Sequence, residues 1–332
     1  MAKIVVLGAG GWGTALATLQ HKNGHEVTMW SPFEEEVAAI RRDGQHKKLL
    51  PGIPVPLSLG LTNDIACVAD ADLIIMTVPS FAIRSTARQM RPHLPDGALV
   101  ANAGKGLEEK TNRRFSEVLK EELPTARVAV LSGPSHAEEV GRGVPTSVCI
   151  AAENMADAQE AQELLMCASF RIYATDDMVG VELGGALKNA IALAAGICDG
   201  LNLGDNTKAA LMTRGLAEIA RLGVALGGKP ATFSGLSGMG DLIVTCGSMH
   251  SRNRRAGILI GQGVSAADAV RQVGTVEGYF VSAAAYQLAQ EMQVELPIIS
   301  QCYRICYEGK PPREALVSLL DRPMQISENF GR

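Results

Sequence analysis

The sequence lacks features that mark several common protein classes. Its 332 residues carry 31 Lys and Arg against 35 Asp and Glu, a net charge of −4, whereas a nucleic-acid-binding protein needs a strong basic excess. None of its seven cysteines forms a Cys-x-x-Cys pair, and Cys302 with Cys306 has no histidine companion, so no metal site is predicted. Scattered cysteines without such a framework indicate reduced thiols, and we expect a cytoplasmic protein.

The sequence also lacks an uncharged run of the roughly 20 residues that would cross a bilayer. The best candidate, residues 183–198, is interrupted by Lys188. The chain passes directly from Met-Ala-Lys into the apolar run 4–8, so no signal peptide is predicted. We see no internal repeat or low-complexity tract. We therefore expect a soluble protein without membrane insertion, and its length indicates two domains.

The first half of the sequence alternates short apolar runs with helical patterns. Seven runs are predicted to be strands: 4–8, 26–30, 73–79, 98–104, 128–133, 146–151 and 171–174. Continuous apolar strands separated by helices are typical of a mostly parallel sheet covered on both faces. This pattern predicts an α/β fold, a doubly wound sheet of the Rossmann type.

Beyond residue 178, strand-like runs nearly vanish and Ala/Leu-rich helical patterns replace them. Six are predicted to be helices: 181–199, 206–226, 250–261, 265–273, 279–292 and 312–320. Asp205 or Asn206 is the expected cap of the second, and Gly227 with Gly228 should end it. The second half is therefore predicted to be an all-helical domain.

A Gly-x-Gly-x-x-Gly motif, formed by Gly8, Gly10 and Gly13, follows the first strand and opens a helix. Gly8 permits a tight turn, Gly10 lets a pyrophosphate approach the backbone, and Gly13 allows the helix to pack closely on the strand. The start of the helix adds amides and the positive end of its dipole. The predicted cofactor is NAD or NADP.

The choice between these two coenzymes stays open in the sequence. Ser31 stands near the end of the second strand, where an acid would bind the ribose of NAD or an arginine the 2′-phosphate of NADP. The acidic run 34–36 behind Pro32 is predicted to begin a helix instead. Phe81, after the third major strand, either contacts the cofactor or is a core aromatic.

Three polar residues follow strands of the first half. Lys105 lies between two glycines, so it is either an ordinary solvated lysine or lies close to a ligand that the glycines admit. Gly133 and Ser135 form a turn into a helix whose start can bind a carbonyl or a phosphate. His136 in the same turn is either a general base or an ordinary residue at a helix start.

The run Ser251-Arg252-Asn253 begins a helical pattern in the second half. Together with the backbone amides of a helix start, these side chains can hold a phosphate. The adjacent Arg254 and Arg255 are predicted to be surface residues, because charge clusters usually face solvent.

Lys188 is the one charge within the apolar segment 183–198. A buried lysine either pairs with an anion or loses its proton. The candidate anions are Asp241, the only charge across residues 230–251, and a substrate phosphate. Burial should lower the pKa of Lys188, whereas an anionic partner should raise it.

The sequence resembles the bacterial NAD(P)-dependent glycerol-3-phosphate dehydrogenases nearly end to end. The similarity runs through the ordered motifs GAGGWGTALA, NAGKGLE, LSGPSHAEEV, GALKNAIALAAGI, GDNTKAALMTRGLAEI, GLSGMGDLIVTC, SRNRR and VEG. It implies a Rossmann domain over 1–178, a helical substrate-binding domain over 179–332, and a reaction in the cleft between them. The implied reaction interconverts sn-glycerol 3-phosphate and dihydroxyacetone phosphate by hydride transfer with NAD(P), supplying phospholipid synthesis. A homodimer is also a family expectation.

The resemblance implies roles for individual residues. Lys188 would be the proton acceptor, with Lys105 and Asp241 as further catalytic residues. With these implied neighbours, Lys105 should lower the pKa of Lys188 and Asp241 should raise it. To act as a base at neutral pH, Lys188 needs a pKa that falls from about 10.4 to roughly 7–8. The implied substrate-binding residues are Lys105, Gly133, Ser135, Lys188, Asp241, Ser251, Arg252 and Asn253. The implied cofactor-binding residues are Gly8, Gly10, Gly11, Trp12, Gly13, Phe81, Lys105, Ala137, Arg252, Val276 and Glu277.

The chain departs from the family at three positions. Gly11 stands where Ser is usual, His136 where Phe is usual, and Pro32 where a basic residue is common; the last departure argues against a strong NADP preference. Two alternative functions stay open. One is a dehydrogenase acting on a hydroxy carboxylate, which the adjacent Lys188 and Asn189 would suit, and the other is a nicotinamide-binding sensor without turnover.

Overall fold

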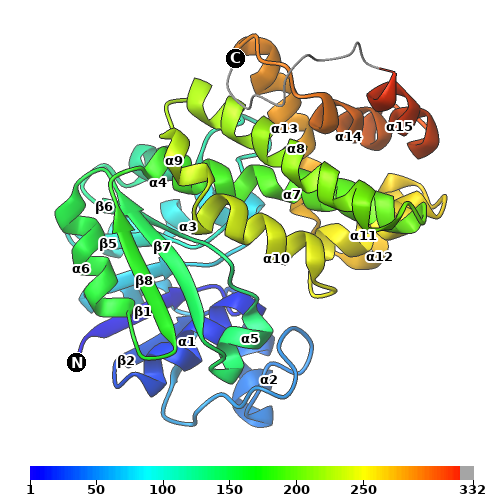
Figure 1. Cartoon of the computed structure of the whole chain (residues 1–332). Coiled ribbons are helices and arrows are strands. Elements are labelled where there is room, and N and C mark those ends of the chain that lie inside the picture. The colour runs from blue at the N-terminus through cyan, green and yellow to red at the C-terminus, as the bar shows by residue number, and fades with distance from the viewer. Residues whose placement is uncertain (322–332) are drawn as a thin grey trace. The chain divides into compact units, whose positions relative to one another are not determined.

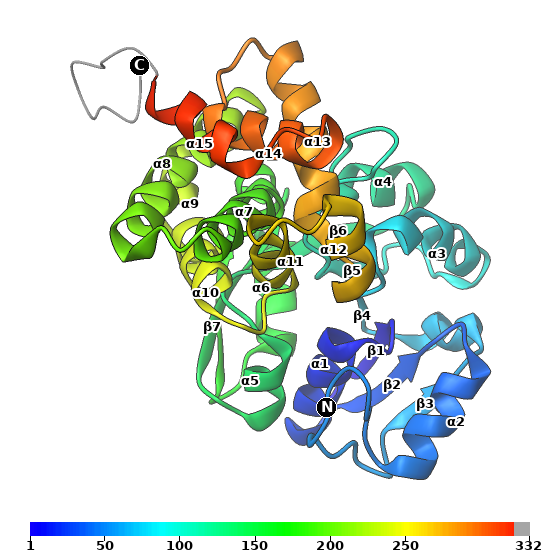
Figure 2. The same cartoon turned by 90° about the vertical axis from the view of Figure 1, so that its right-hand side faces the viewer.

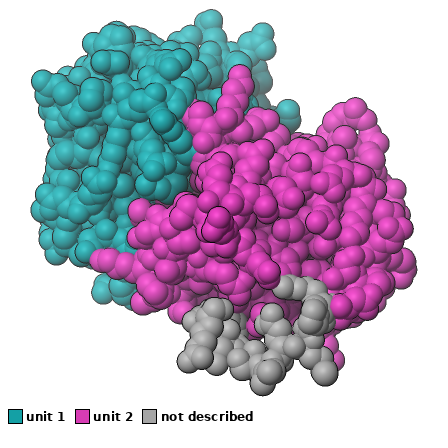
Figure 3. Space-filling model, turned by 90° about the horizontal axis from the view of Figure 1, so that it is seen from above, with its two compact units in different colours: residues 1–104, 113–178 teal, residues 105–112, 179–332 magenta. Residues whose placement is uncertain are grey.

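The chain forms two compact units in the computed structural model, which describes residues 1–321 (Figures 1 and 3). The first unit comprises residues 1–104 and 113–178. The second comprises residues 105–112 and the described chain from residue 179 onward. The short segment 105–112 therefore packs with the helical half, although it follows a strand of the first half in the sequence.

One eight-stranded sheet forms the centre of the first unit. Its strands are β1 (Lys3–Leu7), β2 (Glu26–Trp30), β3 (Gly60–Thr62), β4 (Leu73–Met76), β5 (Leu99–Asn102), β6 (Arg127–Ser132), β7 (Thr146–Ala152) and β8 (Phe170–Thr175). Their spatial order is β3-β2-β1-β4-β5-β6-β7-β8. Neighbours are parallel except β6 and β7, which are antiparallel. The predicted mostly parallel Rossmann-type sheet is confirmed.

Helices cover both faces of this sheet because its strands are apolar on both sides. In β1, Ile4 and Val6 join one core with α1, α5 and α6, whereas Val5 and Leu7 join a second core with α3 and α4. The helices are α1 (Gly11–Lys22), α2 (Glu34–Asp43), α3 (Ile83–Met90), α4 (Phe115–Glu122), α5 (Ala137–Arg142) and α6 (Met155–Leu165), with 3-10 turns η1 (Ile65–Asp70), η2 (Ser80–Ala82) and η3 (Arg91–His93). The sheet is thus doubly wound, as predicted.

The second unit is entirely helical in its described residues, as predicted. Its elements are α7 (Met178–Gly200), α8 (Gly204–Ala225), α9 (Pro230–Phe233), the π-helical turn η4 (Leu236–Gly240), α10 (Asp241–Gly247), α11 (Arg252–Gly261), α12 (Ala266–Val273), α13 (Glu277–Glu291), α14 (Pro297–Tyr307) and α15 (Pro312–Leu320). Figures 1 and 2 show α7 running through the middle of this unit.

Helix α7 is long and apolar enough to cross a membrane by length and composition, but its most apolar stretch is completely buried in the structure. It is therefore a core helix. Glycines let it touch α11 backbone to backbone. A Cβ on Gly196 would lie 2.1 Å from the carbonyl oxygen of Arg254, and one on Gly257 would lie 2.1 Å from that of Leu193. This close contact fixes the start of α11 against α7.

Several details differ from the sequence predictions, and the short helices α9 and α10 were not among the six predicted helices. The predicted cap of α8 at Asp205 or Asn206 is wrong, because the helix already begins at Gly204; Asp205 lies in the first turn, where its charge favours the dipole. The strand β3 was not predicted, because three residues are too few to show a period. Helix α14 was also missed, since its Ile, Tyr and Cys residues are weaker helix formers. The predicted stop is confirmed, with Gly227 at φ +99° directly after α8.

We predict that two glycines of one motif differ in their contribution to stability. A Cβ on Gly13 would lie 1.9 Å from the carbonyl oxygen of Gly8, whereas one on Gly10 meets no atom within 4 Å. Gly13→Ala should therefore lower the free energy of unfolding by about 1–3 kcal/mol through overpacking. The matched control Gly10→Ala should change it by less than about 1 kcal/mol, as a cap substitution does. Denaturant unfolding measures both, and equal losses would contradict the packing account.

Candidate active site

A buried carboxylate shared by two ammonium groups lies at the centre of the second unit's polar site. Asp241 accepts a hydrogen bond from Lys188 Nζ at 2.7 Å through Oδ1, and another from Lys105 Nζ at 2.9 Å through Oδ2. The side chains of Asp241, Lys188 and Lys105 are 2%, 6% and 18% exposed. They come from α10, α7 and the segment 105–112, so the fold brings together residues that are distant in sequence.

The glycine-rich turn before α10 positions Asp241. A Cβ on Gly238 would lie 2.1 Å from the carbonyl oxygen of Phe233, and one on Gly184 of α7 would lie 2.8 Å from that of Ser237. Only glycine therefore allows η4 to pack this tightly against α9 and α7. The turn ends directly at Asp241, and π-helical turns frequently occur at functional sites.

Thr245 belongs to the same cluster, although the sequence analysis did not select it. Lys188 Nζ donates a hydrogen bond to Thr245 Oγ1 at 2.6 Å, and the threonine hydroxyl donates to the carbonyl oxygen of Asp241 at 2.6 Å. Residues four apart share one face of a helix. The signal was available in the sequence as Asp241-x-x-x-Thr245, but it required knowing that a helix begins at Asp241.

A chain of amide hydrogen bonds ties the surrounding elements together. Asn189 Nδ2 donates to the carbonyl oxygen of Lys105 at 3.0 Å, and Asn253 Nδ2 donates to Asn189 Oδ1 at 2.8 Å. Asn253 Oδ1 in turn accepts from the amide of Gly278 at 2.8 Å. Asn189 was not among the predicted site residues, yet it connects the segment 105–112 with α11 and the start of α13.

The predicted Ser-Arg-Asn cluster divides into residues with different roles. Ser251 caps α11, its Oγ accepting from the amide of Arg254 at 3.2 Å, while Arg252 is exposed in the first turn. The prediction that Arg254 is a surface residue is wrong: its side chain is 16% exposed and its Nε lies 2.7 Å from a carboxylate oxygen of Asp199. That partner comes from α7, far away in sequence. Arg255 is exposed, as predicted.

The electrostatics of the cluster follow the predicted directions. The pKa of Lys188 is lowered to about 8, mainly by burial; the charge of Asp241 opposes this shift and the charge of Lys105 adds to it. Burial alone would raise the pKa of Asp241, but the charges of Lys105 and Lys188 outweigh it and hold that pKa below its usual value. Two cations beside one anion leave an excess positive charge when all three are ionised, which favours a bound anion.

The first unit offers a site that fits a dinucleotide. Gly8 has φ +114°, which the tight turn after β1 requires, and a Cβ on Gly10 would point into open space. The indole Nε1 of Trp12, in the first turn of α1, is buried without a hydrogen-bond partner among the described residues. Helix amides at such a start also lack intrahelical partners. Open space beside hydrogen-bond donors suits the phosphates of a dinucleotide.

The departure at Gly11 has a local cause. A Cβ at this position would lie 2.6 Å from the carbonyl oxygen of Leu49. The loop after α2 approaches the start of α1 so closely that a side chain on residue 11 would require the loop to shift.

The acidic run 34–36 begins α2, as predicted, and its last member pairs with residues beside β2 and behind α2. Ser31 donates a hydrogen bond to the Glu36 carboxylate, and His46 Nε2 lies 3.3 Å from the other oxygen of that carboxylate. The bond to His46 holds the pKa of Glu36 below its usual value although burial opposes this. These contacts of Glu36 with Ser31 and His46 were not predicted, because His46 lies ten residues further along the chain, in the loop behind α2.

The remaining predicted residues lie in turns and at helix starts. Phe81 is 74% exposed, which excludes the core-aromatic interpretation. Gly133 has φ +142°, and Ser135 Oγ donates to its carbonyl oxygen at 2.9 Å. His136 precedes α5 without a side-chain capping bond, and Ala137 begins that helix.

Val276 and Glu277 of the second unit stand at the start of α13. Val276 is fully buried and Glu277 is half-buried.

The chain matches the two family models of one dehydrogenase family. Residues 3–158 match the model described as NAD-dependent glycerol-3-phosphate dehydrogenase N-terminus, and residues 177–317 match the corresponding C-terminus. The chain is 54% identical over 322 residues to glycerol-3-phosphate dehydrogenase [NAD(P)+] of Moorella thermoacetica, covering 96% of both chains. It is 48% identical to the protein of that name from Desulfitobacterium hafniense, covering 97% of this chain and 92% of the relative.

A solved structure supports the same relationship. The crystal structure of glycerol-3-phosphate dehydrogenase from Coxiella burnetii superposes with a TM-score of 0.92 at 40% identity, covering 97% of this chain and 99% of the other.

We predict that the cluster tolerates the loss of one cation better than the loss of its anion. Lys188→Met leaves Asp241 paired with Lys105, so the free energy of unfolding at pH 7 should change by no more than about 1–2 kcal/mol. Asp241→Asn removes the carboxylate that accepts from both ammonium groups, beside the buried Lys188, and should cost on the order of 3–5 kcal/mol. Denaturant unfolding of the two nearly isosteric variants measures both losses of stability. A larger loss in Lys188→Met than in Asp241→Asn would contradict a shared carboxylate.

Proposed function

Because the chain belongs to the NAD-dependent glycerol-3-phosphate dehydrogenase family, we propose that Lys188 transfers the proton in the interconversion of sn-glycerol 3-phosphate and dihydroxyacetone phosphate. The chain is an oxidoreductase that uses NAD or NADP and acts on a small phosphate ester. The observation that carries the role of Lys188 is its burial beside Asp241, with a pKa of about 8.

The proton moves between Lys188 Nζ and the oxygen at C2 of the substrate. In reduction of the ketone, the protonated ammonium donates its proton to the carbonyl oxygen. In oxidation of the alcohol, the neutral amine accepts the hydroxyl proton. A pKa near 8 leaves about one tenth of the lysine neutral at pH 7, so both forms are available near neutrality.

Asp241 and Thr245 would hold the reacting amine in place. The carboxylate and the hydroxyl each accept a hydrogen bond from Nζ, at 2.7 and 2.6 Å, which fixes its direction. Lys105, on the other oxygen of Asp241, limits how far that carboxylate can raise the pKa of Lys188. The opposing effects of Asp241 and Lys105 therefore keep the pKa of Lys188 close enough to neutral pH for it to gain and lose a proton.

The substrate phosphate would be bound by the excess positive charge and by the start of α11. Arg252 is exposed in the first turn of that helix, beside Ser251, and arginine binds phosphate oxygens in pairs. Gly133 and Ser135 are further proposed substrate contacts. Asn253 acts in this proposal mainly by holding Asn189 and thereby the backbone at Lys105.

The dinucleotide would be held at the turn of Gly8, Gly10 and Gly13, with Trp12 donating from its indole. When bound, the nicotinamide supplies or accepts the hydride at C2. The other proposed cofactor-binding residues are Gly11, Phe81, Lys105, Ala137, Arg252, Val276 and Glu277.

Three wider properties belong to the same proposal. The product sn-glycerol 3-phosphate would supply phospholipid synthesis, the enzyme would work in the cytoplasm, and it would form a homodimer. Static light scattering tests the last of these.

Absorbance of the nicotinamide band during incubation with dihydroxyacetone phosphate tests the reaction, run in parallel with NADH and NADPH. Oxidation of either coenzyme is expected, and the ratio of the two kcat/KM values determines the preference. Turnover of a hydroxy carboxylate but not of the phosphate ester would favour the other dehydrogenase class. Coenzyme binding without turnover of either substrate would favour a sensor.

We predict opposite pH profiles for the two directions. The kcat/KM for oxidation of sn-glycerol 3-phosphate should rise as the pH increases through about 8, because Lys188 must be neutral to accept a proton. The value for reduction should fall over the same range. Lys188→Met should abolish both activities while NADH affinity, measured by fluorescence titration, stays within about twofold. Loss of NADH binding in this variant would instead indicate a structural lysine.

Arg252→Ala should weaken phosphate binding selectively. We expect KM for dihydroxyacetone phosphate to rise at least tenfold, since a charge-assisted bond to phosphate contributes about 1.5–3 kcal/mol. Arg255 lies three residues further along the same helix and is also exposed. Arg255→Ala therefore serves as the matched control and should leave KM unchanged. An unchanged KM in Arg252→Ala would remove this residue from the phosphate site.

A further inference from the structure

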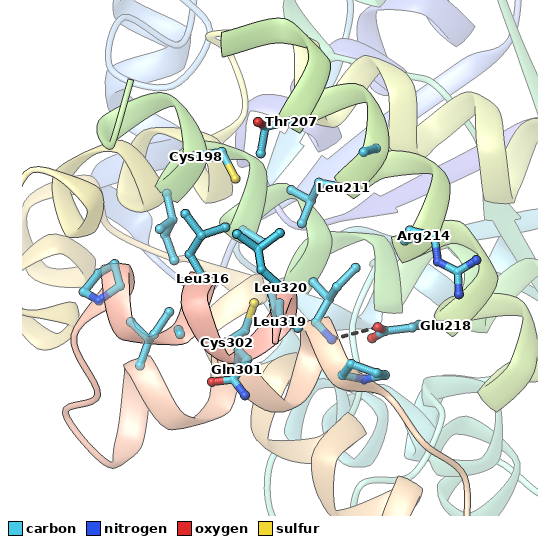
Figure 4. Close-up of a pocket in the computed structure, with 18 of the residues that line it drawn as sticks. Cys198, Thr207, Leu211, Arg214, Glu218, Gln301, Cys302, Leu316, Leu319 and Leu320 are labelled. Carbon is cyan, nitrogen blue, oxygen red and sulfur yellow. Dashed lines mark hydrogen bonds between the residues drawn. The ribbon is translucent and has the colours of Figure 1, made fainter. Parts of the chain in front are cut away.

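A cavity of about 540 Å³ lies among α7, α8, α14 and α15 in the second unit (Figure 4). Leu211 of α8 and Leu316, Leu319 and Leu320 of α15 line it, together with Ile197 of α7. None of the residues placed in the active site contributes to it. Its volume lies within the range of small-molecule sites, whereas ordinary protein interiors are close-packed.

Helix α15 covers this cavity without filling it. Of its side chains only Ala315 is buried, and Leu320 is 73% exposed although it lines the cavity. The apolar face of α15 therefore buries little surface against the core of its own unit. A ligand in the cavity would supply further apolar contacts to this helix.

The cavity carries no net charge. Its charged lining residues are two arginines, Arg214 and Arg221, and two glutamates, Glu218 and Glu295. Glu218 is buried, and its two oxygens accept the amides at the start of α14 at 2.7 and 3.0 Å. Arg221 donates to the carbonyl oxygen of Glu295 at 2.6 Å. A charged ligand would therefore lose its hydration without gaining an excess counter-charge.

Two polar side chains in the lining suit a hydroxyl group. The Thr207 hydroxyl donates to the carbonyl oxygen of Leu203 at 3.1 Å, so its oxygen can accept from a ligand. Gln301 Oε1 accepts from Lys310 at 2.9 Å, which leaves the N–H groups of its carboxamide as donors. Both labelled side chains border the cavity in Figure 4.

We propose that this cavity binds a neutral molecule with an alkyl chain and a hydroxyl head, a second ligand site distinct from the phosphate-ester site. The apolar lining contacts the chain, and Thr207 or Gln301 hydrogen-bonds the hydroxyl. This site rests only on the contacts of α7, α8, α14 and α15, and it does not depend on the proposed role of Lys188.

Octan-1-ol and octanoate distinguish a neutral head from an anionic one on the same chain. Isothermal titration calorimetry of the full-length protein should show saturable one-to-one binding of octan-1-ol, with octanoate at least tenfold weaker. Ala210→Trp narrows the cavity from an exposed lining position and should abolish binding. The neighbouring Ala209→Trp, equally exposed but outside the lining, is the matched control and should bind like the wild type.

Turnover of dihydroxyacetone phosphate, unchanged in both variants, shows that they fold. If Ala210→Trp does not fold, Leu316→Trp on α15 replaces it. Octanoate binding as tightly as the alcohol, or undiminished alcohol binding in the cavity variant, would overturn the proposal. The absence of saturable alcohol binding in the wild type would also overturn the proposal. If, in that case, Ala210→Trp lowers the mass measured by light scattering, the apolar surface is an interface between copies of the chain.

Discussion

One buried carboxylate shared by the ammonium groups of Lys188 and Lys105 is the constraint on which the second unit depends. Asp241 can remain ionised in the interior only because Lys105 and Lys188 each occupy one of its oxygens. Several otherwise unfavourable features of the sequence serve this contact. A glycine-rich turn brings α10 close to α7, and a short segment from the first half of the sequence enters the helical unit to deliver Lys105.

The cluster of Asp241, Lys105 and Lys188 favours reactivity at a cost in folding stability. A carboxylate shared by two cations leaves the positive charge incompletely compensated, and the second cation adds to the effect of burial in lowering the pKa of Lys188. In the proposed function, the same excess charge would attract the substrate phosphate. Sites that bind charged substrates commonly retain such unfavourable contacts. Here the cost is limited, because Thr245 and the Asn189–Asn253 pair satisfy the remaining polar groups by hydrogen bonds.

The sequence allowed the principal pairing to be predicted, and its limits have physical causes. Lys188 and Asp241 each stood alone in an apolar stretch, so the cost of burying a charge made Asp241 one of two candidate anions, with a substrate phosphate as the other. Thr245 escaped notice because a turn dense in glycine conceals the start of a helix. Arg254 was misjudged because its partner Asp199 is 55 residues away. Local patterns thus identify elements and isolated charges, whereas contacts between distant helices require the fold.

The packing of residues 105–112 with the helical unit has a consequence for the order in which the chain folds during synthesis. Lys105 precedes Asp241 by 136 residues, which at about 5–20 residues per second corresponds to on the order of ten seconds on the ribosome. Leu107 of the same segment is buried in a helical core whose next members along the chain begin at Leu183 of α7. The segment can therefore reach its final packing only after the first helices of the second half have been synthesised.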